Sequence, residues 1–130
     1  MRTKPTILII EDNPENLQLI TYLLKAHGYA PLVATDGEQG IATAERELPN
    51  LVLCDINMPV KDGYEVAKAF RASSSLRSLP LIAITSYAMV GDRERILASG
   101  FDGYISKPIQ PESFVQEIES IFSSRQVANP

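Results

Sequence analysis

The sequence predicts an α/β protein of the (βα)5 type, doubly wound, in which a five-stranded parallel sheet carries helices on both faces. Short apolar runs alternate along the chain with segments in which apolar residues recur at helical spacing. The runs contain no alternation of apolar and polar residues, which is typical of parallel strands that are buried on both faces. Right-handed crossovers between successive strands then place helices on both sides of the sheet.

The expected strands are short, and each is bounded by turn residues or by a change to helical spacing. The first of them is the run Thr6-Ile7-Leu8-Ile9-Ile10. In chain order the expected strands span residues 6–10, 30–34, 51–54, 81–84 and 103–105.

The helices between the strands are marked by residues that begin and end helices. Asn13 offers a capping side chain, and Pro14 suits a first helical turn. Gly28 is a good C-terminal stop for that helix, and Asp36-Gly37 turns the chain into the second one. The remaining helices are expected over residues 64–72, 90–99 and 111–122.

Length and composition predict one domain. A chain of 130 residues with 45% apolar residues can build one core, and no linker leads to a second domain. We expect residues 1–5 to be an N-terminal extension, residues 6–122 the domain, and residues 123–130 a flexible C-terminal tail. The formal net charge of −4 argues against broad binding to nucleic acid, so no direct DNA binding is expected.

The sequence also predicts the compartment. The single Cys54 excludes a disulfide within the chain and fits a reducing environment. The first five residues lack the apolar stretch of a signal peptide, and no run approaches the about 20 apolar residues of a membrane span. We therefore expect a cytoplasmic protein with no membrane contact.

Charged residues directly follow three of the apolar runs. Glu11-Asp12 follow the first expected strand, and Asp55 follows the third. Lys107 follows the run Tyr104-Ile105-Ser106, which contains the end of the fifth. The carboxyl ends of parallel strands meet at one edge of a sheet, where open α/β folds place their sites. Carboxylates at close range disfavour one another's ionisation, so we expect a divalent, oxygen-seeking cation and the Lys107 ammonium to compensate them.

This constellation suits phosphoryl transfer. Asp55, expected to be exposed at the sheet edge, could attack phosphorus and carry an aspartyl-phosphate. Mg²⁺ keeps several waters, so Asp12, Asp55 and one backbone carbonyl would suffice as direct ligands, with Glu11 acting through water. Lys107 would neutralise the phosphate, and Thr85 could donate a hydrogen bond to it.

Taken together, the motifs resemble the receiver domain of two-component response regulators, over roughly residues 6–122. The resemblance is strongest to stand-alone, CheY-like or DivK-like receivers, which implies the flavodoxin/CheY-like fold. The motifs that carry it are Glu11-Asp12-Asn13, Asp55-x-Asn57-Met58-Pro59-x-x-Asp62-Gly63, Thr85-Ser86 and Tyr104-x-x-Lys107-Pro108.

The resemblance implies a role for each residue around the metal. Asp55 is similar to the phosphoacceptor of the family, and Glu11 and Asp12 resemble the acid pair that organises Mg²⁺. Asn57 would supply a further metal ligand through its main-chain carbonyl rather than its side chain.

The resemblance also implies a phosphate-binding and switching set. Thr85 and Lys107 resemble the phosphate-binding pair, with the small Ser86 beside the phosphate. Tyr104 is similar to the switch aromatic that turns inward when Thr85 moves toward the phosphate. The bond between Lys107 and Pro108 is expected to be cis, as in the family.

The implied function is that of a phosphorelay switch, not an enzyme. A histidine kinase or a histidine phosphotransfer protein would donate the phosphoryl group. The face built from the fourth helix, the fifth strand and the fifth helix would then bind a downstream protein, with Arg93, Arg95 and Gln116 as candidate contacts. We expect a monomer or a weak dimer.

Tyr87 lies two residues past Thr85 and could obstruct the water that hydrolyses the phosphoryl group. A long-lived phosphorylated state would follow, and autodephosphorylation of Tyr87→Ala compared with the wild type tests this hypothesis. Unchanged or slower decay in the variant would contradict it.

Three alternatives remain. An aspartate-nucleophile phosphatase would need a second acid two residues after Asp55, where this chain has Asn57. The intact site residues argue against a pseudo-receiver with an inactive site; they are Glu11, Asp12, Asp55, Thr85 and Lys107. A nucleotide or flavin site would need a glycine-rich loop after the first strand, which is absent.

Structural roles are expected for Cys54 as a buried strand residue and for His27 at a helix end.

Overall fold

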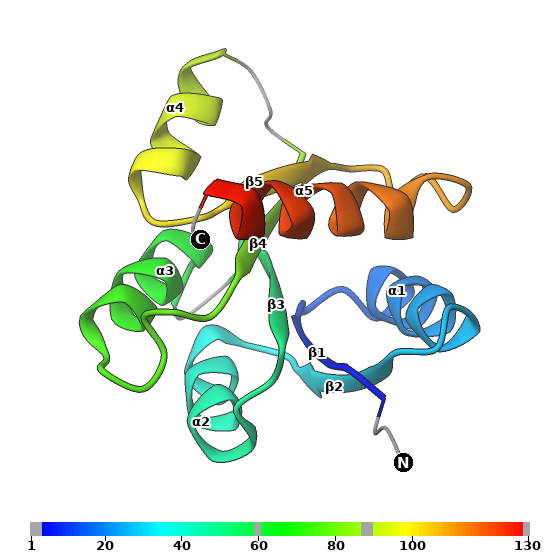
Figure 1. Cartoon of the computed structure of the whole chain (residues 1–130), viewed down its shortest axis with the longest axis horizontal. Helices are drawn as coiled ribbons and strands as arrows, with labels where there is room; N and C mark the ends of the chain where they lie inside the picture. Colours follow the sequence, from blue (N-terminus) through cyan, green and yellow to red (C-terminus); the bar gives the residue numbers. More distant parts are fainter. Residues whose placement is uncertain (1–3, 59–60, 87–89, 129–130) are drawn as a thin grey trace.

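In the computed structural model, which describes residues 4–58, 61–86 and 90–128, five parallel strands form a single sheet with the order β2-β1-β3-β4-β5 (Figure 1). This is the fold class that the sequence predicts. The strands are β1 (Thr6–Ile10), β2 (Ala30–Ala34), β3 (Leu51–Asp55), β4 (Leu81–Thr85) and β5 (Gly103–Ser106).

The helices cover both faces of the sheet, as Figure 1 shows. They are α1 (Pro14–Ala26), α2 (Gly37–Glu47), α3 (Gly63–Ala72), α4 (Val90–Ala98) and α5 (Phe114–Ala128). Side chains of α1 and α5 belong to one buried cluster, and side chains of α2, α3 and α4 belong to the other. Among the described residues, no helix is both long and apolar enough to cross a membrane.

Strand β1 explains why the apolar runs lack alternation. Leu8 and Ile10 lie in the cluster beneath α2, α3 and α4, whereas Ile7 and Ile9 lie in the cluster beneath α1 and α5. All four side chains are at most 1% exposed. Both faces of the strand are therefore interior, and each position needs an apolar residue.

The strand order determines where the charged residues of the candidate site lie. From β1 the chain moves outward to β2 and then returns across β1 to β3, so that β1 lies between β2 and β3. Ile10 pairs with Cys54, Asp55 with Ile84, and Thr85 with Ser106. The carboxyl ends of β1, β3, β4 and β5 thus lie along one edge, at the point where the direction of the crossovers reverses.

The capping prediction for the first helix is confirmed, and helices α2 and α3 also begin with capping side chains. The Asn13 side chain accepts a hydrogen bond from the Asn16 amide at 2.9 Å, with Pro14 at the start of the helix. Asp62 and Glu65 form a reciprocal capping box on α3. The Asp62-Gly63 motif therefore begins a helix.

Several elements run further than the sequence indicates. Strands β3, β4 and β5 each gain one residue, because Asp55 and Thr85 still pair with the neighbouring strand. Helix α5 begins at Phe114, three residues later than expected, and continues to Ala128. Residues 123–128, which we expected to be a flexible tail, are therefore helical. Between Phe122 and Ala128 there is no glycine or proline to end the helix.

Candidate functional site

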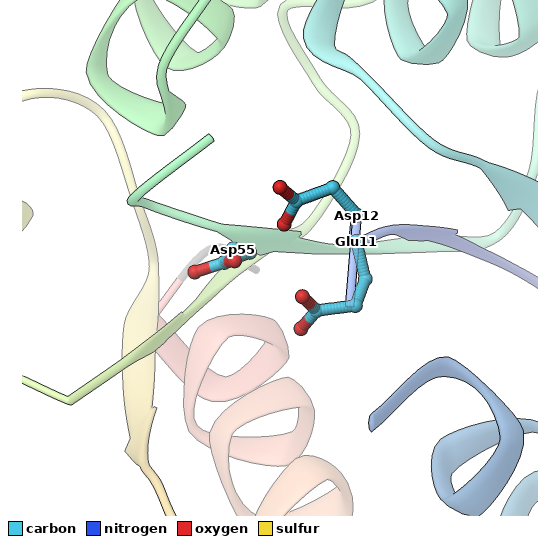
Figure 2. A group of neighbouring side chains, drawn as sticks. All are labelled: Glu11, Asp12 and Asp55. Atoms are coloured by element: carbon cyan, nitrogen blue, oxygen red, sulfur yellow. The ribbon is translucent and has the colours of Figure 1, made fainter. Parts of the chain in front are cut away.

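The acidic residues meet at the carboxyl ends of β1 and β3. Glu11 and Asp12 directly follow β1, and Asp55 is the last residue of β3. Figure 2 shows their carboxyl groups gathered at these neighbouring strand ends. One carboxylate oxygen from each of the three side chains lies within 4.8 Å of the other two. The convergence expected from parallel strands is therefore present.

The three carboxylates differ in exposure. Glu11 is 0% exposed and Asp55 is 2% exposed, whereas Asp12 is exposed. We expected the Asp55 carboxylate to be exposed at the sheet edge, and this was wrong. Asp55 still pairs within the sheet, and the loop after it buries Ile56 and Met58. Solvent therefore reaches the cluster on the side of Asp12.

Lys107 lies between the two buried acids. Its Nζ atom is 3.3 Å from Asp55 Oδ2 and 3.4 Å from Glu11 Oε1. The lysine side chain is 17% exposed, so solvent screens these ion pairs only in part. One ammonium cannot neutralise three carboxylates, and the cluster keeps an excess of negative charge.

The electrostatics of Glu11 show the consequence of that excess. Burial, and then the neighbouring Asp55 carboxylate, raise the pKa of Glu11 to about 7, against the lowering effects of the Asn13 amide and Lys107. The Asn13 N–H donates to Glu11 Oε2 at 3.1 Å. Among the described residues, no donor forms a hydrogen bond with Glu11 Oε1. A buried, incompletely satisfied acid pair fits a hard divalent cation, for which carboxylate oxygens are the preferred ligands.

The loop after β3 orients the Asp55 carboxylate. The backbone N–H of Asn57 donates to Asp55 Oδ1 at 3.2 Å, and the Asn57 side chain is exposed. The Gly63 N–H donates to the Ile56 carbonyl at 2.8 Å, which folds the loop back onto the strand end.

Gly63, which the sequence presents only as the last residue of the motif that begins at Asp55, is a positioning residue. A Cβ atom there would lie 2.6 Å from Ile56 Cα and 2.9 Å from the Asp55 carbonyl oxygen. Only glycine allows this approach between the start of α3 and the end of β3. The sequence carries the signal in Asp62-Gly63, but it does not show what the glycine must approach.

The residues assigned to phosphate binding lie on β4 and β5. Thr85 ends β4 and is 1% exposed, and the following Ser86 is exposed. The Lys107 N–H donates to the Thr85 carbonyl at 2.8 Å, which ties the two strand ends together. The peptide bond between Lys107 and Pro108 is cis, as predicted.

Tyr104 lies on β5, outside the acidic cluster. Its ring is partly buried, and it packs against the core on the side of α4. Tyr87, for which we predicted an effect on hydrolysis, lies outside the described residues.

Cys54 and His27 have structural positions. Cys54 is fully buried in β3, and burial raises the pKa of its thiol well above the usual value. The His27 Nδ1 atom lies 2.9 Å from the Leu23 carbonyl oxygen at the end of α1. Neither residue joins the charged cluster.

Comparison with known proteins identifies relatives of the whole domain. Residues 7–119 match the family model of the response regulator receiver domain. The polar-differentiation response regulator DivK of Brucella anthropi is 39% identical over 115 residues, which cover 88% of this chain and 94% of that protein.

Solved structures agree with this assignment. The chemotaxis response regulator CheY4 of Vibrio cholerae has a TM-score of 0.87 at 27% identity, covering 92% of this chain and 99% of its own. The receiver domain of a Pseudomonas aeruginosa sensor histidine kinase, with a magnesium ion coordinated in its active site cleft, has a TM-score of 0.81 at 37% identity. That match covers 89% of this chain and 94% of the other. The chain therefore belongs to the response regulator receiver domain family.

Proposed function

We infer that Asp55 is the phosphoacceptor of this receiver domain and that phosphorylation requires Mg²⁺. The observation that carries the proposal is the Asp55 carboxylate, held by the Asn57 amide at 3.2 Å and by Lys107 at 3.3 Å beside the Glu11-Asp12 pair. An aspartate fixed in this way is positioned as a nucleophile before a donor arrives.

The donor is a phosphohistidine of a histidine kinase or a histidine phosphotransfer protein. An Asp55 carboxylate oxygen forms a bond to phosphorus while the bond from phosphorus to the donor nitrogen breaks. The imidazole leaves with the bonding electron pair and takes a proton from solvent. Lys107 is positioned to balance charge on the phosphoryl oxygens, and the Thr85 and Ser86 hydroxyls can donate hydrogen bonds to them.

Asp12, Asp55 and the main-chain carbonyl of Asn57 would hold Mg²⁺ directly, with Glu11 acting through water. When bound, the ion supplies positive charge that offsets repulsion between the acids and an incoming phosphoryl group. The exposure of Asp12 gives the ion a route into a cluster whose other acids are buried.

Phosphate then alters the face formed by α4, β5 and α5, which binds a downstream protein. Arg93 and Gln116 are exposed on the two helices of this face, whereas Arg95, which we also expected there, lies over the Tyr64 ring of α3. A hollow of about 380 Å³ lies between β5 and the start of α5, and its lining residues are Tyr104, Ser106, Lys107, Pro108, Gln110 and Glu117. Because Lys107 also contacts Asp55, the hollow and the phosphorylation site share a residue.

The proposal is tested with acetyl phosphate and Mg²⁺, followed by measurement of the intact mass. The wild type is expected to gain one phosphoryl group, and Asp55→Asn none. Asp36→Asn is the matched control, because Asp36 only caps α2 and asparagine caps as well as aspartate. A phosphorylated Asp55→Asn variant, or an unmodified wild type that also fails to bind beryllofluoride, would overturn the assignment.

A further inference from the structure

Over residues 92–98, helix α4 buries little apolar surface against the domain. Among residues 92–98 only the Ile96 side chain is buried, and Leu97 is 48% exposed. The neighbouring α3 buries Val66, Ala67 and Phe70 in the same core. Figure 1 accordingly shows α4 at the periphery of the domain. Other contacts must hold its orientation, and arginines supply them.

Two contacts with α3 involve α4 and the turn that follows it. The guanidinium carbon of Arg95 lies 4.0 Å from the centroid of the Tyr64 ring, a close cation–π contact. Beyond the end of α4, Arg71 of α3 donates two hydrogen bonds to the Gly100 carbonyl, at 2.8 and 2.6 Å. Hydrogen bonds from a charged donor are among the stronger ones. On the α3 side, α4 therefore has one close cation–π contact, and the turn after the helix accepts two charged hydrogen bonds.

A third contact joins α4 to β5 and is looser. The guanidinium carbon of Arg93 lies 6.0 Å from the centroid of the Tyr104 ring, at the outer limit of a cation–π contact. Residues two apart on a helix point about 200° apart, so Arg93 and Arg95 reach opposite neighbours. Helix α4 thus lies between two tyrosine rings, and its cation–π distance is shorter on the α3 side than on the β5 side.

We propose that Arg93 is a positioning residue that restrains the phosphorylation switch by holding the Tyr104 ring in its partly buried resting position. The inference rests on the proposed function and names its regulation. Helix α4 turns about its two contacts with α3, and the Arg93–Tyr104 contact is the one released. A contact made only in the resting state opposes phosphate binding, because binding must break it.

The proposal predicts the sign of an effect. Arg93→Gln should increase the affinity for beryllofluoride, an analogue of the phosphoryl group, about twofold to fivefold, the range that corresponds to one exposed cation–π contact. Loss of a positive charge alone would weaken the binding of an anion. An increase therefore reports release of the switch rather than a change in the local field.

Arg95→Gln is the matched control. It removes the same charge from the same helix, but its partner Tyr64 lies on α3, on the side that stays fixed. No gain in affinity is expected for it. Arg93→Lys keeps a cation over the ring and should restore an affinity close to that of the wild type. Both arginines are exposed, so the variants should fold.

The experiment titrates beryllofluoride with Mg²⁺ into protein carrying ¹³C-labelled tyrosine rings, and follows the Tyr104 signal by NMR. Tyr104→Phe identifies that signal among those of the five tyrosines. Without beryllofluoride, the signal in Arg93→Gln should move toward its position in the saturated wild type, and in Arg95→Gln it should not.

The outcomes separate the two proposals. A wild type that does not bind beryllofluoride would overturn the proposed function, and this inference with it. A wild type that binds normally, with no tighter binding in Arg93→Gln, would leave the function intact and overturn the role of Arg93. An equal gain in Arg95→Gln would also overturn it.

Discussion

Both the amino-terminal and the carboxyl-terminal edges of the sheet carry ionic groups that are at least partly buried, but only at the amino-terminal edge are the opposite charges balanced. At the amino-terminal edge, Arg71 donates to the carbonyls of Arg77, Leu79 and Gly100 and pairs with Asp102 at 3.2 Å. At the carboxyl-terminal edge, Lys107 pairs with two of the three clustered carboxylates, and a buried Glu11 oxygen has no hydrogen-bond donor among the described residues.

The two clusters differ in role: the charges around Arg71 stabilise the fold, whereas the excess negative charge of the acidic cluster can bind a ligand. The Asp102 carboxylate also accepts a hydrogen bond from the Leu81 amide at 2.8 Å, so the Arg71 cluster joins α3 to the starts of β4 and β5. Within this cluster, the Arg71 guanidinium and the Asp102 carboxylate both have hydrogen-bond partners and pair with each other. The acidic cluster has an excess of negative charge, which a cation can reduce.

The largest expected effect is on the balanced edge. Arg71→Met removes five hydrogen bonds and leaves the Asp102 carboxylate without its cation. Because both side chains are partly exposed, the expected loss in the free energy of unfolding is about 2–4 kcal/mol, below the cost of breaking a fully buried pair. Urea unfolding measures it. Arg77→Met, which removes an exposed side chain, should change stability by less than about 0.5 kcal/mol. Equal losses in the two variants would remove the contrast between the edges.

A smaller effect of opposite sign is expected at the acidic edge of the metal-free protein. The pKa of Glu11 is about 7 in the folded state, against 4.5 for the unperturbed group. The folded state therefore binds more protons in this interval, and its stability falls as the pH rises from about 4.5 to about 7. Glu11→Gln should remove this decline and stabilise the protein at pH 8 by about 1–2 kcal/mol, after allowance for screening. Denaturant unfolding at a series of pH values measures it, and a variant with the wild-type decline would show that Glu11 is not its source.

Bound Mg²⁺ should restore part of the stability that the metal-free protein loses when its acidic cluster ionises. At a free concentration tenfold above its dissociation constant, Mg²⁺ should stabilise the wild type by about 1.4 kcal/mol. Asp12→Asn should lose the response, because Asp12 is the exposed member of the acid group. Thermal unfolding with Mg²⁺ and with K⁺ at equal ionic strength separates binding from screening. A full response in Asp12→Asn would place the ion elsewhere.

The smallest effect concerns another polar contact near the balanced edge. The Tyr29 hydroxyl donates to Glu119 Oε2 at 2.5 Å, and burial, followed by this carboxylate, raises the pKa of Tyr29 to about 12. The folded state retains the phenol proton longer than the unfolded state, so this contribution to stability is lost as the pH rises from about 10 to about 12. Tyr29→Phe should cost about 0.5–1 kcal/mol at pH 8 and flatten that loss. Alkaline unfolding curves of both proteins provide the measurement.

The sequence was sufficient for features that depend on neighbouring residues or on strand order. The apolar run before Glu11 and the one ending at Cys54 predict buried parallel strands, and parallel strands bring their ends together. That reasoning placed Lys107 beside Glu11 and Asp55 without any knowledge of distances.

Features that depend on packing between distant segments could not be predicted in this way. The burial of Asp55 depends on how the following loop closes over it, and that closure requires Gly63 against Ile56. The partners of Arg71 are mostly backbone carbonyls, which carry no signature in the sequence. The end of α5 was missed because local polarity resembles a tail, although nothing in the segment ends a helix.

The order of the charged residues along the chain has a consequence for how the protein is made. Glu11, Asp12 and Asp55 all precede Lys107, whose ammonium pairs with Glu11 and Asp55. A nascent chain emerging from its amino terminus carries the three acids before their counter-charge has been synthesised. Strand β5 lies at the edge of the sheet, and its addition delivers Lys107 to the cluster. The last strand to be translated therefore completes the sheet and brings the positive charge that reduces, without cancelling, the negative charge at the ends of β1 and β3.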